Sequence, residues 1–406
     1  MNGDRRWSRT CCTAVGLAAV GTLVLGGCSH SNTSSAKGGD KASGGGNGGT
    51  ATSADATPVT LAVSPDAATA MSPATPIVVT ASHGVLQSVT VSNTAGYQVK
   101  GAFSADKTTW TSTEVLGYGK TYQVQATGTA SSGGATNQVK QTVHVVSPAT
   151  QTYPSLIPAP GHTDVGIGQP LVVRFDQPVT DHAAAEKAMT VTSTPVQAGA
   201  WYWMSNKEAH YRPKVYWKAG STVKLAVGIY GLDLGNGVYG QTDRTLTVHI
   251  HDSWVAKADG ASHTLVVYHN GARVKSMATS LGSTKYPSHT GPHVISAKNP
   301  SVVMDSSTYG VGKGQPGYYR ETVYWDERIS NDGEFVHAAP WSVGSQGSSN
   351  VSHGCVNLSV DNAKWFYAHF GVGDVVEITN SGGKQLPVWD TYGDWALSWS
   401  EWTAGQ

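Results

Sequence analysis

The sequence is poor in charged residues and in cysteine, and each shortage narrows what the protein can be. Charged side chains make up 13% of its 406 residues, about half the share that is usual for soluble domains. Long solvent-exposed helices depend on such charges, so an all-helical protein is disfavoured. Lysine plus arginine and aspartate plus glutamate both number 27, and this zero net charge argues against a nucleic-acid binder that relies on a basic surface.

Turn-forming and β-branched residues take the place of the missing charges. The chain has 48 glycines and many threonine, valine and serine residues, and 39% of its residues are hydrophobic. This composition favours short strands joined by turns and supplies enough apolar surface for packed cores. We therefore predict a mainly β protein. At about 150 residues per domain, its length corresponds to two or three domains.

The N-terminal region lacks a hydrophobic run long enough to span a membrane comfortably. Three arginines precede an apolar run over 14–25, which suits the hydrophobic region of a signal peptide. The run ends in Leu25-Gly26-Gly27-Cys28, which resembles a bacterial lipobox, where cleavage before the cysteine is followed by its lipidation. We therefore predict a lipoprotein signal peptide over 1–28 and an exported protein that Cys28 anchors to the outer face of the cell membrane. The alternative is an ordinary signal peptide with an incidental cysteine.

Only one free cysteine remains once that signal peptide is removed. Cys11 and Cys12 are lost with it and Cys28 is acylated, so Cys355 has no intramolecular partner and no disulfide framework exists. A lone thiol outside the cell is exposed to oxidation, which makes Cys355 a candidate nucleophile. A buried structural cysteine is the alternative.

After the signal peptide, the composition changes from a flexible segment to strand-forming blocks. Residues 29–57 are almost all small or polar, and we predict a flexible Gly/Ser-rich tether because they cannot bury enough surface to fold. Short alternating runs separated by turn residues then predict two immunoglobulin-like β-sandwich domains, over 58–147 and 148–251. The clearest of these runs are 59–63, 77–79, 89–91, 122–124, 171–175 and 246–250.

The two blocks share a short internal repeat. Gly119–Val124 aligns with Gly220–Leu225 at an offset of about one hundred residues, the length of one immunoglobulin-like domain. Asp233 stands alone in a glycine-rich stretch, which favours a plain turn over a cation-binding loop. The second block also holds aromatic residues that we assign to core packing rather than to a carbohydrate-stacking face: Trp201, Trp203, Tyr211, Tyr216 and Trp217.

From residue 252 onward the pattern mixes strands with helix. Ser359 is expected to cap a helix over 361–370. Tryptophans at 395, 399 and 402 have helical spacing and predict an amphipathic turn. We therefore predict a third, mixed β domain over 252–379 and a Trp-rich extension over 380–406 that packs on it. The strands expected in this domain are 264–268, followed by an Asn270-Gly271 hairpin turn, then 334–337 and 375–378.

The stretch Ser352–Asn357 surrounds the remaining cysteine with features of a catalytic turn. Gly354 permits a tight backbone turn that leaves Cys355 unobstructed. The helix expected downstream brings its N-terminus near this turn, where partial positive charge favours a thiolate. Backbone N–H groups around Gly354 and Cys355 are expected to converge on an oxyanion.

Two histidines are candidates for the base that a cysteine acyltransferase requires. His353 is too close to Cys355 in sequence for the side chains to meet easily, whereas His337 ends a predicted strand and can approach from a neighbouring one, so we assign the base to His337. A zinc site is the other use of these three side chains, but no second cysteine closes it, and we predict no metal. The order of His337 before Cys355 argues against papain-like peptidases.

His337, fourteen intervening residues and then Ser-His-Gly-Cys-Val-Asn resemble the active-site signature of the L,D-transpeptidases, whose catalytic domain has the YkuD fold. The lipobox and the two sandwich domains resemble the actinobacterial branch of this family. Over about 58–402, the resemblance implies a YkuD-type catalytic domain at 252–379 behind two immunoglobulin-like domains. Three further segments carry it: Met304–Gly310, Gly317–Arg320 and His337–Gly344.

The resemblance implies a reaction on the stem tetrapeptides of peptidoglycan. Cys355 would attack the carbonyl of the third residue, a diamino acid, and release the terminal D-alanine. A side-chain amine of a second stem would then resolve the thioester, which links two third-position residues. His337 would act first as base and then as acid. The family implies no cofactor and no nucleic acid, attachment to the membrane through the lipid anchor, and acylation of Cys355 by carbapenems.

The same motifs imply roles for the residues around this pair. Relatives often have serine after the base, and Ala338 serves equally if only its backbone carbonyl orients the imidazole. The residues expected to form or support the oxyanion hole and the base are Ser352, His353, Gly354, Tyr319 and Ala338. The residues expected to contact the donor peptide, form a flap over the site or line its wall are Asp332, Gly333, Asn357, Met304, Tyr309, Tyr319 and Trp341.

Two alternatives remain open. An L,D-carboxypeptidase would use the same acyl-enzyme with water as the acceptor, and the residues do not distinguish it because both reactions share that intermediate. A non-catalytic lipoprotein could bind the cell wall through its sandwich domains, but neither the cysteine nor the histidine of the signature is missing.

Overall fold

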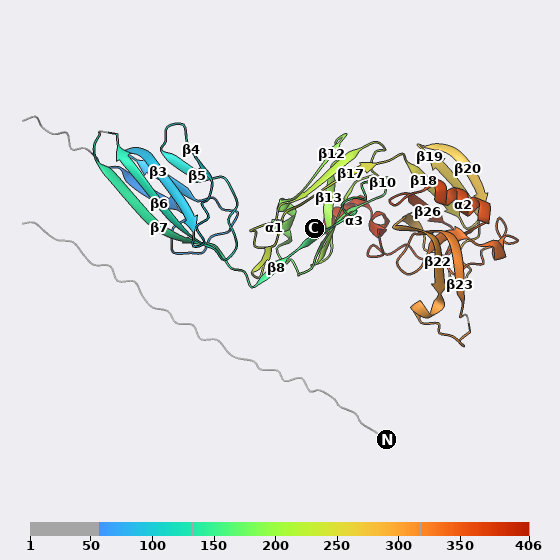
Figure 1. The fold of residues 1–406 in the computed structure, drawn as a ribbon. Coiled ribbons are helices and arrows are strands. Elements are labelled where there is room, and N and C mark those ends of the chain that lie inside the picture. Colours follow the sequence, from blue (N-terminus) through green and yellow to red (C-terminus); the bar gives the residue numbers. More distant parts are fainter. Residues whose placement is uncertain (1–56, 132, 317, 406) are drawn as a thin grey trace, which may run out of the picture. The chain divides into compact units, whose positions relative to one another are not determined.

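A computed structural model describes residues 57–131, 133–316 and 318–405, without the side chain of Tyr309. The predicted signal peptide with Cys28 and nearly all of the predicted tether lie outside these residues. Figure 1 shows strands throughout and few helices, which confirms the mainly β prediction. None of the helices in the described ranges is long and apolar enough to cross a membrane.

The first strand-rich region is a sandwich of a four-stranded and a three-stranded sheet around an apolar core. Side chains along β6 alternate between buried and exposed, as in a strand with one face on a core. Buried residues from both sheets, among them Val79, Trp110, Val124 and Val143, form one cluster. The first sheet has the order β1 (Thr60–Ser64), β2 (Val78–Ser82), β5 (Thr109–Ser112), β4 (Gly101–Phe103), and the second β3 (Gly84–Asn93), β6 (Thr121–Ala130), β7 (Thr136–His144).

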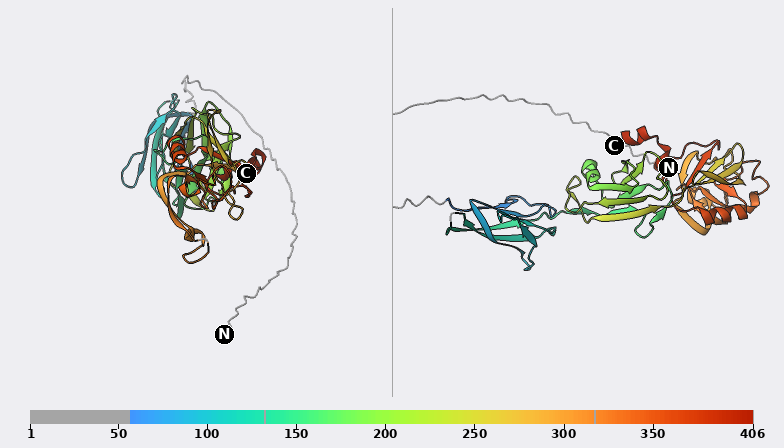
Figure 2. Two further views of the ribbon diagram at one scale, coloured as in Figure 1. Left: turned by 90° about the vertical axis from the view of Figure 1, so that its right-hand side faces the viewer. Right: turned by 90° about the horizontal axis from the view of Figure 1, so that it is seen from above.

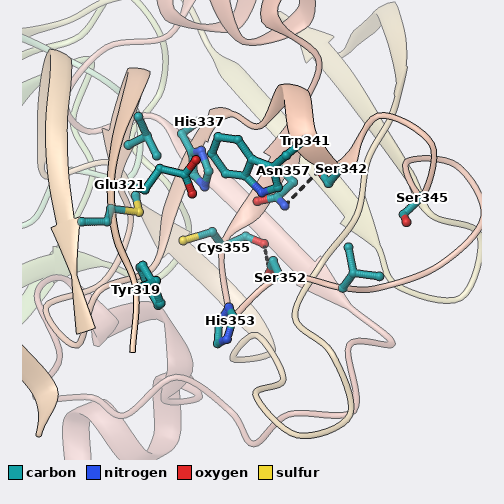
Figure 3. Close-up of a pocket in the computed structure, with 13 residues that line it drawn as sticks. Tyr319, Glu321, His337, Trp341, Ser342, Ser345, Ser352, His353, Cys355 and Asn357 are labelled. Carbon is teal, nitrogen blue, oxygen red and sulfur yellow. Dashed lines mark hydrogen bonds between the residues drawn. The ribbon is translucent and has the colours of Figure 1, made fainter. Parts of the chain in front are cut away.

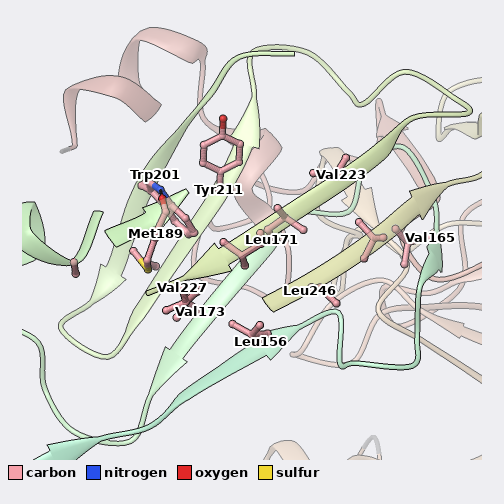
Figure 4. Close-up of a cluster of buried hydrophobic side chains, with 14 of the residues drawn as sticks. Leu156, Val165, Leu171, Val173, Met189, Trp201, Tyr211, Val223, Val227 and Leu246 are labelled. Carbon is pink, nitrogen blue, oxygen red and sulfur yellow. Dashed lines mark hydrogen bonds between the residues drawn. The ribbon is translucent and has the colours of Figure 1, made fainter. Parts of the chain in front are cut away.

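The second region is also a sandwich, built from two four-stranded sheets. Figure 4 shows side chains from both sheets meeting between them, including Leu156, Val173 and Val223. One sheet has the order β10 (Asp164–Val165), β17 (Arg244–Ile250), β15 (Thr222–Val227), β12 (Met189–Thr194), and the other β13 (Gly199–Ser205), β14 (Glu208–Pro213), β11 (Leu171–Phe175), β9 (Pro154–Ile157). A short helix and a two-stranded ribbon complete the region: α1 (His182–Ala188), β8 (Thr150–Thr152) and β16 (Val238–Gly240).

The aromatic cluster of the second block belongs to this core, as predicted. Trp201, Tyr211 and Trp217 are buried, and Trp203 and Tyr216 are partly buried against the same cluster. The aromatic faces are therefore occupied by neighbouring side chains, which removes the main support for a carbohydrate-stacking surface.

The short repeat corresponds to the same local structure in both sandwiches. Gly119 and Gly220 each have positive φ, which glycine adopts without strain. The N–H of Gly119 donates to the carbonyl of Val146, and that of Gly220 donates to the carbonyl of Ile250. Each glycine thus turns the chain just before the strand that pairs with the last strand of its region.

The third region combines a five-stranded and a four-stranded sheet with one covering helix. Ser359 Oγ accepts a hydrogen bond from Asn362 N at 3.3 Å and caps α2 (Val360–His369), which confirms the predicted start of this helix. One sheet has the order β20 (Ala272–Ala278), β19 (Thr264–His269), β18 (Trp254–Asp259), β26 (Val375–Thr379), β21 (Gly291–Val294). The other has the order β22 (Ala297–Asp305), β23 (Arg320–Arg328), β24 (Phe335–Ala338), β25 (Val356–Leu358).

Two turns in these regions follow the expected chemistry. Asn270 and Gly271 both have positive φ and join β19 to β20 as a hairpin. Asp233 Oδ1 accepts from Gly235 N at 2.9 Å, which is the bond of an Asx turn.

In Figure 1, β22 and β23 extend away from the rest of the third region, with the short helix η1 (Ser306–Tyr309) after β22.

The C-terminal extension packs on the third region, as predicted, and also on the second sandwich, which was not predicted. Leu386 N donates to the carbonyl of Thr290, just before β21. The extension forms η3 (Gly393–Ala396) and α3 (Trp399–Ala404), and a capping box of Ser398 and Glu401 starts α3. The fully buried Trp402 donates to the carbonyl of Ala200 at 3.0 Å and stacks on Tyr202, both in β13 of the second sandwich. Figure 2 shows this C-terminal segment in dark red beside the green strands of that sandwich.

Arg212 is the residue of the second sandwich around which the tryptophans of the extension gather. The Arg212 guanidinium lies 4.7 Å from the ring of Trp395 and 4.5 Å from that of Trp402, and it donates to the carbonyl of Leu397 at 2.8 Å. A buried guanidinium needs such partners, since removal from water is costly for an unpaired charge. Helical spacing predicted the amphipathic turn, but not that its apolar face would cover a charged residue.

We expect Trp402→Ala to lower the free energy of unfolding by about 3–5 kcal/mol, because it leaves a cavity and exposes Arg212. Urea denaturation followed by fluorescence measures this change. Trp389→Ala is the matched control, because Trp389 is 69% exposed and should change stability by less than about 0.5 kcal/mol. Equal losses in the two variants would contradict the packing role of Trp402.

Candidate active site

The candidate catalytic residues meet at one cavity of about 320 Å³ in the third region (Figure 3). Residues from the β22–β23 hairpin, β24, β25 and the loop before Cys355 line it. They are Met304, Tyr319, Glu321, Val323, His337, Trp341, Ser342, Ser345, Val351, Ser352, His353, Cys355 and Asn357.

Cys355 is held at the end of a tight turn that leads into β25. Gly354 has a φ of 120°, a conformation that strains residues with a side chain. The Ser352 hydroxyl donates to the carbonyl of Cys355 at 2.7 Å and accepts from Gly354 N at 3.1 Å. Since this bond occupies the Gly354 N–H, the backbone N–H groups of His353 and Cys355 are the candidates for oxyanion donors.

His337 faces the same cavity from the neighbouring strand. β24 and β25 pair in parallel, and His337 lies opposite Asn357 in their register. The His337 Nδ1 atom lies 2.9 Å from the carbonyl oxygen of Ala338. A carbonyl only accepts, so Nδ1 carries the proton and Nε2 presents a free lone pair. The backbone of Ala338 thus orients the imidazole, and a serine hydroxyl is not needed at that position.

Burial keeps both members of this pair uncharged. Cys355 is 6% exposed and His337 is 2% exposed. Desolvation lowers the pKa of His337 to about 4. Desolvation, with a smaller effect from the carboxylate of Glu334, raises the pKa of the Cys355 thiol to about 12. At neutral pH the site therefore contains a thiol and a neutral imidazole.

The expectation that a helix N-terminus stabilises a thiolate is wrong. Strand β25 occupies Val356–Leu358 between Cys355 and the helix, and α2 begins only at Val360. The partial charge of a helix dipole falls off within its first turn. The proton must therefore leave the thiol as the reaction proceeds rather than before it.

Asn357 and Trp341 are connected through a residue that the sequence motifs did not single out. Asn357 Nδ2 donates to Ser342 Oγ at 3.1 Å, and Ser342 Oγ donates to the carbonyl of Ala339 at 3.1 Å. These bonds hold η2 (Pro340–Ser342), from which Trp341 lies half-exposed with its ring centre 6.0 Å from that of His337. Trp341 therefore forms one wall of the cavity beside the base.

The ring of His353 packs against two tyrosine rings. Its ring lies 4.8 Å from that of Tyr286 and 5.1 Å from that of Tyr319. Desolvation lowers the pKa of His353, with a smaller effect from the charge of Lys285. These tilted ring contacts hold the imidazole of His353 against the two tyrosines, while its backbone belongs to the catalytic turn.

A second cavity of about 350 Å³ shares Met304 and Tyr319 with the first. Asp332 and Gly333 line this second cavity, and Cys355 Sγ lies 3.7 Å from the carbonyl oxygen of Gly333. The predicted peptide-contacting residues are therefore divided between two cavities. Tyr309 belongs to η1, and its side chain lies outside the described part of the structure.

No three histidine, cysteine, aspartate or glutamate side chains within residues 57–131, 133–316 and 318–405 are arranged to hold a metal ion.

Three further residues contribute to the site although no sequence pattern predicted them. Ser342 lies inside a recognised motif without a distinctive pattern of its own, whereas Ser288 and Glu334 reach the catalytic turn only through long-range contacts.

Comparisons with known proteins agree with this geometry. Residues 253–378 match the family described as the L,D-transpeptidase catalytic domain, and residues 68–233 match the bacterial Ig domain. L,D-transpeptidase 2 of Mycobacterium tuberculosis (strain CDC 1551 / Oshkosh) is 44% identical over 81% of this chain and 80% of its own. L,D-transpeptidase 5 of Mycobacterium tuberculosis (strain ATCC 25618 / H37Rv) is 36% identical over 84% of this chain and 75% of its own. A solved L,D-transpeptidase in complex with imipenem is 33% identical, covers 55% of this chain and 97% of that chain, and has a TM-score of 0.49.

Ser342→Ala tests whether the hydroxyl supports the wall of the cavity. We expect a loss of about 1–3 kcal/mol in the free energy of unfolding, because the buried amide of Asn357 loses its acceptor. Ser348→Ala is the control, since Ser348 donates a comparable bond to the carbonyl of Ser345 but is exposed to solvent. Thermal unfolding followed by circular dichroism measures both, and equal midpoints for Ser342→Ala and wild type would contradict this role.

Proposed function

The chain belongs to the L,D-transpeptidase family, and we propose that it cross-links peptidoglycan stem peptides through a thioester on Cys355. One observation supports this most: a buried neutral imidazole in β24 and a buried thiol in the turn before its parallel neighbour β25 face one cavity. A nucleophile and its base in this arrangement suit acyl transfer. The stem tetrapeptide as donor and the link between two third-position diamino acids follow from the resemblance of the signature.

In the acylation step, Cys355 Sγ attacks the carbonyl carbon of the donor's third residue while its proton passes to His337 Nε2. The oxyanion accepts hydrogen bonds from the N–H groups of His353 and Cys355, with Tyr319 alongside; such a donor typically contributes about 3–4 kcal/mol. The amide bond then breaks, and D-alanine leaves with the proton from His337.

In the second step, the side-chain amine of another stem attacks the thioester carbonyl and gives its proton to His337. The same proton returns to sulfur as the thiol leaves, so the pair is neutral again after each turnover. Two cavities that share Met304 and Tyr319 provide room for two peptides, as this two-substrate reaction requires. Asp332, Gly333 and Asn357 are the proposed contacts of the donor, with Trp341 as the wall.

Carbapenem inhibition follows from the same chemistry. A relative has been solved in complex with imipenem. The strained β-lactam carbonyl is an electrophile of the kind that Cys355 attacks in the donor peptide. We therefore include acylation of Cys355 by carbapenems in the proposed function.

Export and lipid anchoring complete the proposal. The lipobox-like sequence at Cys28 supports attachment to the outer face of the cell membrane, and the Gly/Ser-rich segment over 29–57 would let the folded part reach the cell wall. Metabolic labelling with a fatty-acid analogue tests this, because Cys28→Ala should abolish the label.

Mass spectrometry of the products tests the reaction itself. We expect the chain without residues 1–28 to convert a disaccharide-tetrapeptide into a dimer that lacks one D-alanine. Cys355→Ala should give no product and keep its fold, and His337→Ala should slow acylation much more than binding. Tripeptide without dimer would establish the carboxypeptidase alternative, because water would then win over the amine. Product formation near the wild-type rate in Cys355→Ala would overturn the mechanism.

A further inference from the structure

A cluster of ionisable side chains lies behind the catalytic turn, outside the roles assigned above. Its centre is Glu334, which is 5% exposed and follows Gly333, whose carbonyl faces the catalytic sulfur. His289 approaches it from the segment that leads into β21, and His293 approaches it from β21 itself. The reaction proposed above uses none of these three side chains directly.

This cluster touches the catalytic turn itself. A Cβ at Gly354 would lie 3.3 Å from Glu334 Oε1, so the carboxylate lies directly against the turn. Ser288 Oγ donates to the carbonyl of Gly354 at 2.6 Å, and the next residue, His289, donates its backbone N–H to Glu334 Oε1 at 2.8 Å. One short segment therefore holds both the turn and the carboxylate behind it.

The two imidazoles surround the carboxylate with groups that can offset its charge. His289 Nδ1 lies 3.2 Å from Glu334 Oε1, and His293 Nε2 lies 3.3 Å from Oε2. His293 Nδ1 lies 3.0 Å from the carbonyl of Gly291, which only accepts. Because Nδ1 donates to that carbonyl, Nε2 of His293 can donate to Glu334 only in the imidazolium form. Desolvation would raise the pKa of Glu334, but its contacts with His289 and His293 outweigh desolvation and lower that pKa. A buried carboxylate without such partners would be strongly destabilising.

The charge of this carboxylate acts on the nucleophile. A negative group beside the thiol raises the pKa of Cys355 and opposes the negative charge that develops on sulfur during attack. The contact with the Glu334 carboxylate raises the pKa of His289 above its usual value, so His289 keeps a proton over a wider pH range than a free histidine. A protonated His289 offsets the negative charge of Glu334. A neutral His289 leaves that charge free to oppose negative charge on the sulfur of Cys355.

We propose that His289 is a positioning residue that tunes the reactivity of Cys355 through Glu334. With its proton, His289 pairs with the carboxylate and acylation is fast; without it, the carboxylate opposes the transfer of charge to sulfur. This inference rests on the proposed function, because its effect is read as acylation of Cys355.

Other charged groups near the cluster also influence the pKa values of His289, Cys355 and His353. Asp332 Oδ2 lies 3.7 Å from His289 Nδ1, and Asp390 also acts on the charge of His289. Asp326 and Asp332 act on Cys355 in the same direction as Glu334, while Lys285 acts on His353 across the turn. Among these groups, His289 is the one that contacts Glu334 and also follows Ser288, which holds the catalytic turn.

The test measures the rate of acylation by imipenem between about pH 6 and 9. In the wild-type protein we expect the rate to fall as the pH rises through the pKa of His289, by about tenfold, which corresponds to one pK unit on the nucleophile. His289→Gln should show the slow rate at every pH. Glu334→Gln should show no fall, and the double variant should recover the rate that His289→Gln loses.

That recovery separates an electrostatic effect from a merely structural one, because structural losses would add. NMR titration of His289 should give the same midpoint as the wild-type rate profile. Asp252→Asn is the matched control, since Asp252 pairs with His269 at 3.0 Å on the surface, and its profile should equal that of wild type.

Four outcomes decide the matter. No acylation of the wild-type protein would overturn the proposed function. Acylation with the same pH profile in wild type and His289→Gln would overturn only this inference. A double variant slower than His289→Gln would also overturn it. If Glu334→Gln fails to fold, His289→Gln and the NMR midpoint still decide, because a midpoint apart from the rate profile contradicts the proposal.

Discussion

The parallel pairing of β24 with β25 is the interaction on which the candidate active site depends. It places His337 opposite Asn357 and brings the base to the cavity that holds Cys355. The strands are buried, so neither side chain of the pair is stabilised as an ion by water. Their burial explains why the thiol and the imidazole are neutral. His337 must therefore take the thiol proton while the bond between sulfur and the donor carbonyl forms.

The surroundings of this pair fix its geometry through short local contacts and a few distant ones. Gly354 allows the turn, and Ser352 closes it through two hydrogen bonds. Ser288 and Glu334 support the turn from behind, so the nucleophile is held from both sides. Such support matters for catalysis, because small displacements of a reacting group are costly in rate. The same contacts bring the negative charge of Glu334 close to the sulfur of Cys355. Whether His289 offsets that charge therefore affects the acylation step.

Local signals allowed much of this to be predicted. Period-two alternation identified the strands, Ser359 identified the start of α2, and the sole remaining thiol beside a glycine identified the nucleophile. The three-residue strand β25 was missed because so short a run has no periodicity, and the helix was therefore expected too close to Cys355. The role of Glu334 and the packing of Trp402 on β13 depend on contacts between segments far apart in the sequence. No local sequence pattern predicts such contacts.

The most direct test of this account is the ionisation of Cys355 in the free protein. Thiolate absorbance near 240 nm can be followed against pH in the chain without residues 1–28, with Cys355→Ala as the reference. We predict no thiolate signal at neutral pH and none until well above pH 9, because burial raises the pKa of this thiol to about 12. A full thiolate signal at pH 7 would contradict this prediction and would require an ion pair with His337 before substrate binds.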